Sequence, residues 1–381
     1  MDRRSFLIGT GTVALNQILA GCGNQNQATL NVKFLKGSVP NQVVKAFRTS
    51  IKQSAKLEFA TVAQLENLFE DLQSWQQKDK QPDKERSLIP GISWQQSTKA
   101  PDILTIGDYW LAPSIEQKLI QPLDPTLLQQ WSNLPRRWQE LVTRNERGQP
   151  DEQGKVWAAP YRWGCTMIAY NRDKFQSLGW QPKDWGDLWR EECKGRISLL
   201  NHPREVIGLT LKALGKSYNT ENLNQVPDLE QQLRRLHQQV KFYSSDTYLQ
   251  PLILEDTWLA VGWSNDLLPV IQRYRQFDAV IPTSGTALWA DLWVLPSSTA
   301  SQPLNQNWID FCWQPQIAQQ ISLLSKANSP IPVELNGASI QAKLRPLLIP
   351  NPQIFQRSEF LLPLSVQARQ QYQSLWQAVR G

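Results

Sequence analysis

From residue 30 onward, short apolar runs alternate with segments whose apolar residues recur at helical spacing. The runs at 30–35, 56–62 and 103–107 predict strands, and the segments 41–53 and 62–75 predict helices between them. Parallel strands need long crossover connections, which helices commonly supply, so this alternation is typical of an α/β fold. The order of the elements therefore predicts mainly parallel sheets flanked by helices.

The same alternation continues to the end of the chain. Further strands are predicted at 196–201, 259–264, 277–283 and 287–296, and further helices at 203–215, 227–240, 307–324 and 366–379. One polar stretch, 76–101, interrupts the pattern with charged residues and prolines, and it predicts a long loop or an insertion.

The segment 155–171, KVWAAPYRWGCTMIAYN, is a long and mostly apolar extended run. Its continuous apolar character predicts a strand that crosses from one lobe into another. The length of 381 residues suits two lobes better than one. The 17 tryptophans and the 41% of hydrophobic residues supply ample material for their cores.

Asp291 stands inside another apolar run, ALWADLWVL, between two tryptophans. A buried charge without a partner is very costly, so two interpretations compete. Asp291 either pairs inside the protein with a nearby arginine, or it faces a cavity that holds something positive.

Composition excludes several functional classes. The only two histidines are His202 and His237, and Cys165, Cys193 and Cys312 match no metal spacing, so metal sites and histidine-based triads have no support. The 40 Lys and Arg exceed the 34 Asp and Glu, but they are scattered rather than clustered. We therefore expect no nucleic-acid partner, no metal and no cofactor.

The first 22 residues have the layout of an export signal. A basic start at Arg3 and Arg4 precedes a short apolar stretch that is too short and too polar to span a membrane permanently. Residues 3–7, RRSFL, resemble a twin-arginine export motif, and 19–22, LAGC, resemble a bacterial lipoprotein cleavage box. These resemblances imply lipidation of Cys22, followed by a polar linker at 23–29, and a membrane anchor without a membrane span.

The rest of the chain resembles the spermidine/putrescine-binding proteins of ABC importers. The matching phrases occur in order over about 350 residues: DILT at 102–105, Tyr109, PYRWG at 160–164, AYN at 169–171, WGDLW at 185–189, PREV at 203–206, Gly262-Trp263 and WAD at 289–291. The resemblance implies a two-lobe periplasmic binding protein whose ligand lies between the lobes. It implies one lobe from 30–163 plus 291–327 and another from 164–290 plus 328–381.

The resemblance also implies which residues bind the ligand. Trp289 and Asp291 match an aromatic wall and a carboxylate, and their spacing puts both on one face of a strand. Trp263 and Tyr109 match aromatic positions of the family site, and Glu205 matches a carboxylate near a helix start. For Glu205 a purely structural role remains open, because acids also stabilise helix N-termini. Asp108 is expected to have a surface or capping role.

The chain also departs from the family pattern. His202 stands where the family has an aspartate, and it offers no fixed negative charge at neutral pH. Arg162, if it faces the cleft, would oppose a polycation. The family contacts that fall at Leu35, Ser38, Asn328 and Leu361 are also replaced.

We therefore expect a monomeric, lipid-anchored solute-binding protein on the periplasmic side of the cytoplasmic membrane. It would present a polyamine-like organic cation to an ABC permease, without catalysis. Alternatives are a sugar or an amino acid derivative as the ligand, a sensory role on the same fold, or an exported glycosidase that uses Asp291 and Glu205.

Overall fold

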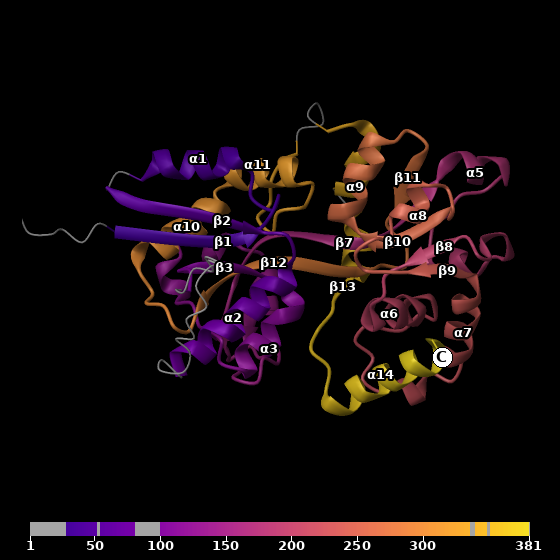
Figure 1. Cartoon of the computed structure of the whole chain (residues 1–381), viewed down its shortest axis with the longest axis horizontal. Coiled ribbons are helices and arrows are strands. Elements are labelled where there is room, and N and C mark those ends of the chain that lie inside the picture. The colour runs from indigo at the N-terminus through magenta and orange to yellow at the C-terminus, as the bar shows by residue number, and fades with distance from the viewer. Residues whose placement is uncertain (1–27, 52–53, 81–99, 336–339, 349–350, 381) are drawn as a thin grey trace, which may run out of the picture.

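Two lobes connected by shared strands make up the part of the chain that the computed structural model describes, residues 28–51, 54–80, 100–335, 340–348 and 351–380 (Figure 1). The export signal, Cys22 and most of the polar 76–101 stretch lie outside the described residues. The strands follow the order β2-β1-β3-β12-β7-β10-β8-β9, with β11, β13 and β4 at the sides. The fold is therefore the predicted mixed α/β architecture.

The first lobe contains a parallel sheet of β1 (Ala28–Leu35), β2 (Ala55–Val62) and β3 (Ile103–Gly107). Side chains alternate between buried and more exposed along β1, whereas all of β3 is buried. The helices of this lobe are α1 (Asn41–Ser50), α2 (Leu65–Lys80), α3 (Leu111–Glu116), α4 (Arg136–Val142), α10 (Pro303–Trp313) and α11 (Pro315–Ser325). Short strands β4 (Ile120–Gln121), β5 (Thr143–Arg144) and β6 (Lys155–Val156) complete it.

The second lobe is built on β8 (Ile197–Leu199), β9 (Val240–Tyr243), β10 (Leu259–Trp263) and β11 (Phe277–Val280). Its helices are α5 (Arg172–Ser177), α6 (Pro203–Ala213), α7 (Leu229–Gln239), α8 (Gln250–Ile253), α9 (Ser264–Arg273) and the C-terminal α14 (Val366–Arg380). The larger of two clusters of buried side chains extends from the first lobe through the crossing strands to α8 and α9, and the smaller lies in the second lobe.

Two long strands, β7 (Ala159–Asn171) and β12 (Ala287–Pro296), run through the middle of the molecule (Figure 1). The first half of β7 pairs with β12, and its second half pairs with β10 and β11. β12 also pairs with β3 of the first lobe. At Gly164 a Cβ atom would overlap Trp289 and the Ser264 hydroxyl, so only glycine fits where β7 passes these side chains.

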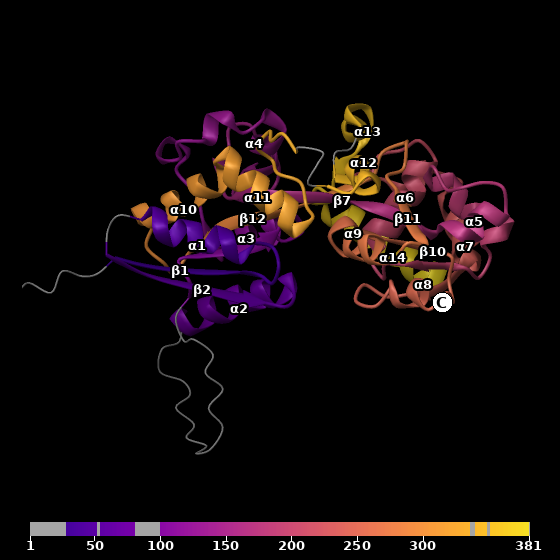
Figure 2. The same ribbon diagram turned by 90° about the horizontal axis from the view of Figure 1, so that it is seen from above.

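The remaining elements cover the connection between the lobes. Figure 2 shows α12 (Arg345–Leu348) and α13 (Pro352–Arg357) above this connection, and β13 (Glu359–Phe360) pairs with the start of β12. Arg137 of α4 donates hydrogen bonds to the carbonyl oxygens of Phe355 and Ser358. The predicted division at 164, 291 and 328 stays a prediction, and the segment after 328 contacts both lobes.

Two predicted elements are each divided into two in the structure. The helix predicted at 307–324 is two helices, α10 and α11, separated at Gln314. Pro315 starts α11, and a residue before proline avoids helical dihedral angles, as Gln314 does with ψ 132°. The long strand predicted over 155–171 is broken between β6 and β7. No helix among the described residues has the length and apolar character needed to cross a membrane.

Candidate ligand-binding site

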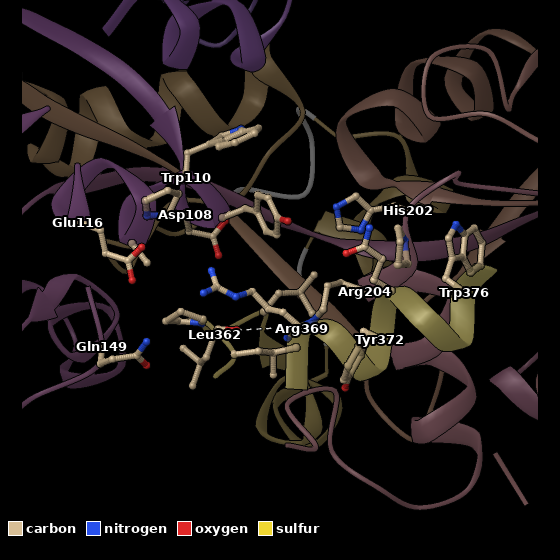
Figure 3. Close-up of a pocket in the computed structure, with 18 of the residues that line it drawn as sticks. Asp108, Trp110, Glu116, Gln149, His202, Arg204, Leu362, Arg369, Tyr372 and Trp376 are labelled. Atoms are coloured by element: carbon tan, nitrogen blue, oxygen red, sulfur yellow. Dashed lines mark hydrogen bonds between the residues drawn. The ribbon is translucent and has the colours of Figure 1, made fainter. Parts of the chain in front are cut away.

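A cavity of about 570 Å³ lies between the two lobes, a volume that suits a small organic solute (Figure 3). The first lobe contributes residues from 108–116 with Arg144 and Gln149, and the second contributes 202–204, 361–364 and side chains of α14. Figure 3 shows Asp108, Glu116 and Gln149 on one side of this cavity, and His202, Tyr372 and Trp376 on the other.

Asp108 is the acid closest to the centre of this arrangement. It follows the carboxyl end of β3, begins a short 3₁₀ turn, and accepts a hydrogen bond from the Ala290 N–H at 2.9 Å. Burial raises the pKa of Asp108 to about 7; the nearby Asp291 raises it further, while Arg144 and the Ala290 hydrogen bond oppose the rise. The hydrogen bond joins Asp108 to strand β12 and caps no helix, and Asp108 lines the cavity, unlike the surface or capping role expected from the sequence.

Two buried arginines line the cavity from opposite lobes. Arg144 ends β5, is 3% exposed, and donates from Nε to the Leu141 carbonyl oxygen at 2.7 Å. Burial lowers the pKa of Arg144 to about 10, although Asp108 counters this. Arg204, in the first turn of α6, donates to the Leu362 carbonyl oxygen at 3.1 Å, and burial lowers its pKa as well. Both side chains remain charged at neutral pH.

Aromatic faces complete the cavity. Tyr109 is 47% exposed, and its ring lies edge-on to the His202 ring at 5.4 Å. Burial lowers the pKa of His202 to about 4, with Arg204 adding to the effect, so His202 is neutral at pH 7. Trp110 stacks on Phe69 at 4.4 Å, and Trp376 of α14 lies across the cavity from it. Such faces pack against methylenes and attract ammonium groups.

Asp291 has its own partner inside the protein. Its Oδ2 lies 2.5 Å from Nε of Arg162, its direct cross-strand neighbour on β7, and the two side chains are 2% and 4% exposed. Burial lowers the pKa of the Arg162 guanidinium, but the charge and hydrogen bond of Asp291 together with Tyr161 outweigh burial, so the pKa is raised. The Arg162 guanidinium also lies 5.6 Å from the Trp289 ring. Of the two interpretations of Asp291, the structure therefore shows the one in which it pairs with a nearby arginine.

Glu205 and Trp263 form a second internal group. The Trp263 indole N–H donates to the Glu205 carboxylate at 3.1 Å, and the Thr166 hydroxyl donates to the same carboxylate at 3.0 and 3.1 Å. Glu205 is 4% exposed, and burial raises its pKa despite these bonds. The group ties β10 and α6 to β7 near the crossing between lobes.

The structure therefore brings only part of the expected site together at the cavity. Tyr109 and His202 line it, whereas Trp263, Glu205, Trp289 and Asp291 are not among its lining residues. Leu361, which stands where the family has a different ligand-contacting residue, does line the cavity. The ligand contacts of all six residues stay predictions.

Sequence reasoning did not find Arg144, Arg204 or the side chains of α14. Arg204 could have been suspected from its place beside His202 at a helix start. Arg144 lies on a two-residue strand in no recognisable motif, and no sequence signal points to it.

The cysteines and acidic residues of the described ranges show no arrangement typical of a metal or disulfide site. Cys165, Cys193 and Cys312 are buried free thiols. Within the described ranges, no group of three or more His, Cys, Asp or Glu residues is arranged to hold a metal ion.

Several curated relatives are similar to this chain over part of its length. A spermidine/putrescine-binding periplasmic protein of Escherichia coli is 26% identical over 226 residues, which cover 58% of this chain and 61% of the relative. A putrescine-binding periplasmic protein of the same organism is 25% identical over 285 residues, 66% of this chain and 75% of the relative. The chain thus matches about three-fifths of the first relative's length.

Solved structures share the fold over most of the chain. A spermidine/putrescine ABC transporter substrate-binding protein from Streptococcus pneumoniae superposes with a TM-score of 0.76 at 19% identity, covering 93% of this chain and 99% of that one. A lipoprotein of Treponema pallidum gives a TM-score of 0.67 at 16% identity, with 92% and 99% covered. The two-lobe architecture is therefore that of periplasmic binding proteins.

A family model described as bacterial extracellular solute-binding protein matches residues 98–352, two-thirds of the chain and most elements of both lobes. With the inter-lobe cavity and the shared fold, this match shows that the chain belongs to the family of bacterial extracellular solute-binding proteins.

Proposed function

We propose that this protein is the solute-binding component of an ABC importer and binds an organic amine of the polyamine-like class between its lobes. The observation that carries the proposal is the inter-lobe cavity, which combines a carboxyl group at Asp108 with the aromatic faces of Tyr109, Trp110 and Trp376. The names of the curated relatives, which refer to putrescine and spermidine, point to the same ligand class.

Asp108 is suited to receive an ammonium group. With a pKa of about 7, its carboxyl group is half ionised near neutral pH in the empty cavity. An ammonium group nearby favours the ionised form and gains a charge-assisted hydrogen bond from it. The solute then contacts both lobes, so binding favours the closed arrangement that a permease would recognise.

The residues expected from the family resemblance take different parts in this proposal. Tyr109 and His202 contact the solute in the cavity, whereas Trp263 and Trp289 act through Glu205 and Arg162 outside its lining. Asp291 and Glu205 act through their internal partners, because each is buried and already bonded within the protein.

The same bonding counts against the proposal of an exported glycosidase. That chemistry needs two carboxyl groups that face one substrate. Asp291 is held by Arg162, and Glu205 is held by Trp263 and Thr166. We therefore propose binding without catalysis. We also propose a position outside the cytoplasmic membrane through a lipid on Cys22, with the protein acting as a monomer beside its permease.

Calorimetry with the full chain tests the amine proposal, with 1,4-diaminobutane and spermidine as probes. Asp108→Asn should weaken amine binding about 10- to 100-fold, the range for loss of a hydrogen bond to a charged group. Asp228→Asn is the matched control, because Asp228 is an exposed acid at the start of α7 whose side chain caps no N–H. An Asp108→Asn variant that binds amines as tightly as the parent would contradict the proposal that Asp108 receives the ammonium group.

A further inference from the structure

Positive charge exceeds negative charge around the cavity. Arg144, Arg204 and Arg369 line it, against the two acids Asp108 and Glu116. Glu116 is exposed, and Asp108 is only partly ionised near pH 7. A solute with an ammonium group at each end would find one carboxylate partner at Asp108, and its second end would lie among arginines. Like charges at close range inside a cleft repel strongly.

Both buried arginines keep hydrogen-bonding capacity that the described part of the chain does not use. Arg144 bonds through Nε, but its Nη1 is buried and has no partner. Arg204 bonds through both terminal nitrogens, to the Leu362 and Tyr218 carbonyls and to the Asn219 side chain, while its Nε has no partner. Buried N–H groups are almost always bonded, so unused donors on two cavity-lining cations suggest a missing acceptor.

Nearby carboxylates act on both arginines through their charge but form no ion pair with either of them in the described part of the chain. Among the described residues, Arg144 and Arg204 form no ion pair, whereas Arg162 at the crossing lies 2.5 Å from Asp291. Helix α6, which has 11 residues, also begins at the cavity, and the side chain of its N-cap residue His202 does not cap it. An uncapped helix N-terminus favours an anion next to it, in the same place as Arg204.

We infer that the solute carries a carboxylate as well as an amine, and that Arg144 and Arg204 bind this carboxylate from opposite lobes. This inference rests on the proposed function: it keeps one amine of a polyamine-like solute and replaces the second with a carboxylate, which makes the solute an amino-acid-like zwitterion. The amine end lies against Asp108 and the aromatic faces, and the carboxylate supplies the acceptor that the arginine N–H groups lack. A carboxylate held by one arginine from each lobe also links the lobes, which favours closure.

A matched series of four-carbon probes separates the two charges. We expect 4-aminobutanoate to bind at least about tenfold more tightly than 1,4-diaminobutane, because it replaces a repelled ammonium with an accepted carboxylate. Calorimetry uses the full chain in a buffer free of carboxylate and phosphate, with succinate as the third probe. The five-carbon series of 1,5-diaminopentane, 5-aminopentanoate and glutarate repeats the comparison at a second length.

The outcomes distinguish this inference from the proposed function. Tighter binding of the diamines, lost in Asp108→Asn, overturns the inference and leaves the amine proposal standing. Tighter binding of the dicarboxylates overturns the amine proposal and keeps an anion site. Binding of none of the six probes overturns both.

Variants locate the carboxylate site. Arg144→Gln and Arg204→Gln should each weaken 4-aminobutanoate at least about tenfold, and neither should weaken 1,4-diaminobutane, because each removes a charge that repels its second ammonium group. Arg369→Gln changes an exposed side chain of α14, so it tests the cavity charge even if a buried variant fails to fold. It should reduce the preference for the aminocarboxylate about twofold. Arg275→Gln, an exposed arginine outside the cavity, removes the same charge and should change neither affinity. Equal losses for both probes in the arginine variants would overturn the assignment.

Discussion

Two groups of buried charge lie near the crossing between the lobes, and they differ in how completely they are paired. Arg162 and Asp291 face each other across β7 and β12, and each satisfies the charge of the other. In the cavity, Arg144 and Arg204 have unused donors, and Asp108 holds its proton up to about pH 7.

This difference teaches that burial of a charged residue does not by itself identify a binding site. Asp291 is the more buried acid and matches a family position, yet its Oδ2 is bonded to arginine. The cavity group is less obvious from sequence, but its two arginines have donors without partners in the described part of the chain. An incomplete set of partners is the better indication that something else binds.

The largest expected effect comes from breaking the complete pair. Arg162→Met should destabilise the protein by about 3–5 kcal/mol, because it leaves Asp291 buried without a counter-charge. Urea unfolding, followed by circular dichroism, measures the loss.

The double variant Arg162→Met with Asp291→Leu is the control for that experiment. It should recover most of the stability, because no charge is left unpaired. If Asp291→Leu alone left stability unchanged but abolished amine binding, Asp291 would bind the ligand directly. That result would contradict the claim that only the cavity group binds the solute.

The second effect is a pH dependence of amine affinity, and it arises from Asp108 in the incompletely paired cavity group. Asp108 has a pKa of about 7, so its ionised fraction rises from about one-tenth at pH 6 to about nine-tenths at pH 8, and affinity for 1,4-diaminobutane should rise about tenfold. Arg144, with a pKa of about 10, stays charged through this window, and His202, with a pKa of about 4, stays neutral. Burial raises the pKa of Asp291, although the ion pair with Arg162 opposes the rise. Calorimetry at pH 6, 7 and 8 measures the slope.

Asp108→Asn should remove that slope, and a slope that survives in this variant would assign the titration to another group. Stability should change in the opposite direction to affinity. The folded pKa of about 7 lies above the ordinary value of 3.8, so the folded state binds the extra proton and the contribution of Asp108 to stability is lost as pH rises between them.

The smallest effect concerns Glu205, whose carboxylate is bonded like that of Asp291. Glu205→Gln should cost about 1 kcal/mol of stability, because the amide oxygen can still accept from Trp263 and only part of the bonding to Thr166 is lost. Amine affinity should change by less than about twofold. Thermal unfolding and calorimetry test this together, and a tenfold loss of affinity with unchanged stability would place Glu205 against the solute.

Local patterns predicted most of the fold. The strands at 103–107 and 287–296 have the bounds expected from their apolar runs, because both are buried on two faces. The α/β class follows from the same patterns. The helix break at Gln314 was not predicted from the sequence, although Pro315 indicates it.

The site was harder to predict, because it depends on contacts between distant parts of the chain. The Asp291–Arg162 pair depends on the register of two strands whose residues are 129 positions apart, and no local pattern fixes that register. The cavity combines a turn after β3, the end of β5, the start of α6 and one side of α14. These segments lie far apart in the sequence, so no single segment carries a recognisable motif.

Gly164 has a consequence for engineering this protein toward other solutes. Since a methyl group there would overlap both Trp289 and Ser264, the crossing strand tolerates no other residue at this point. Leu361 and Tyr109, by contrast, present side chains to open space in the cavity. In a library that randomises all three positions, selection for any new solute should return glycine at 164 while the other two diversify, so altered recognition can evolve without rebuilding the joint between the lobes.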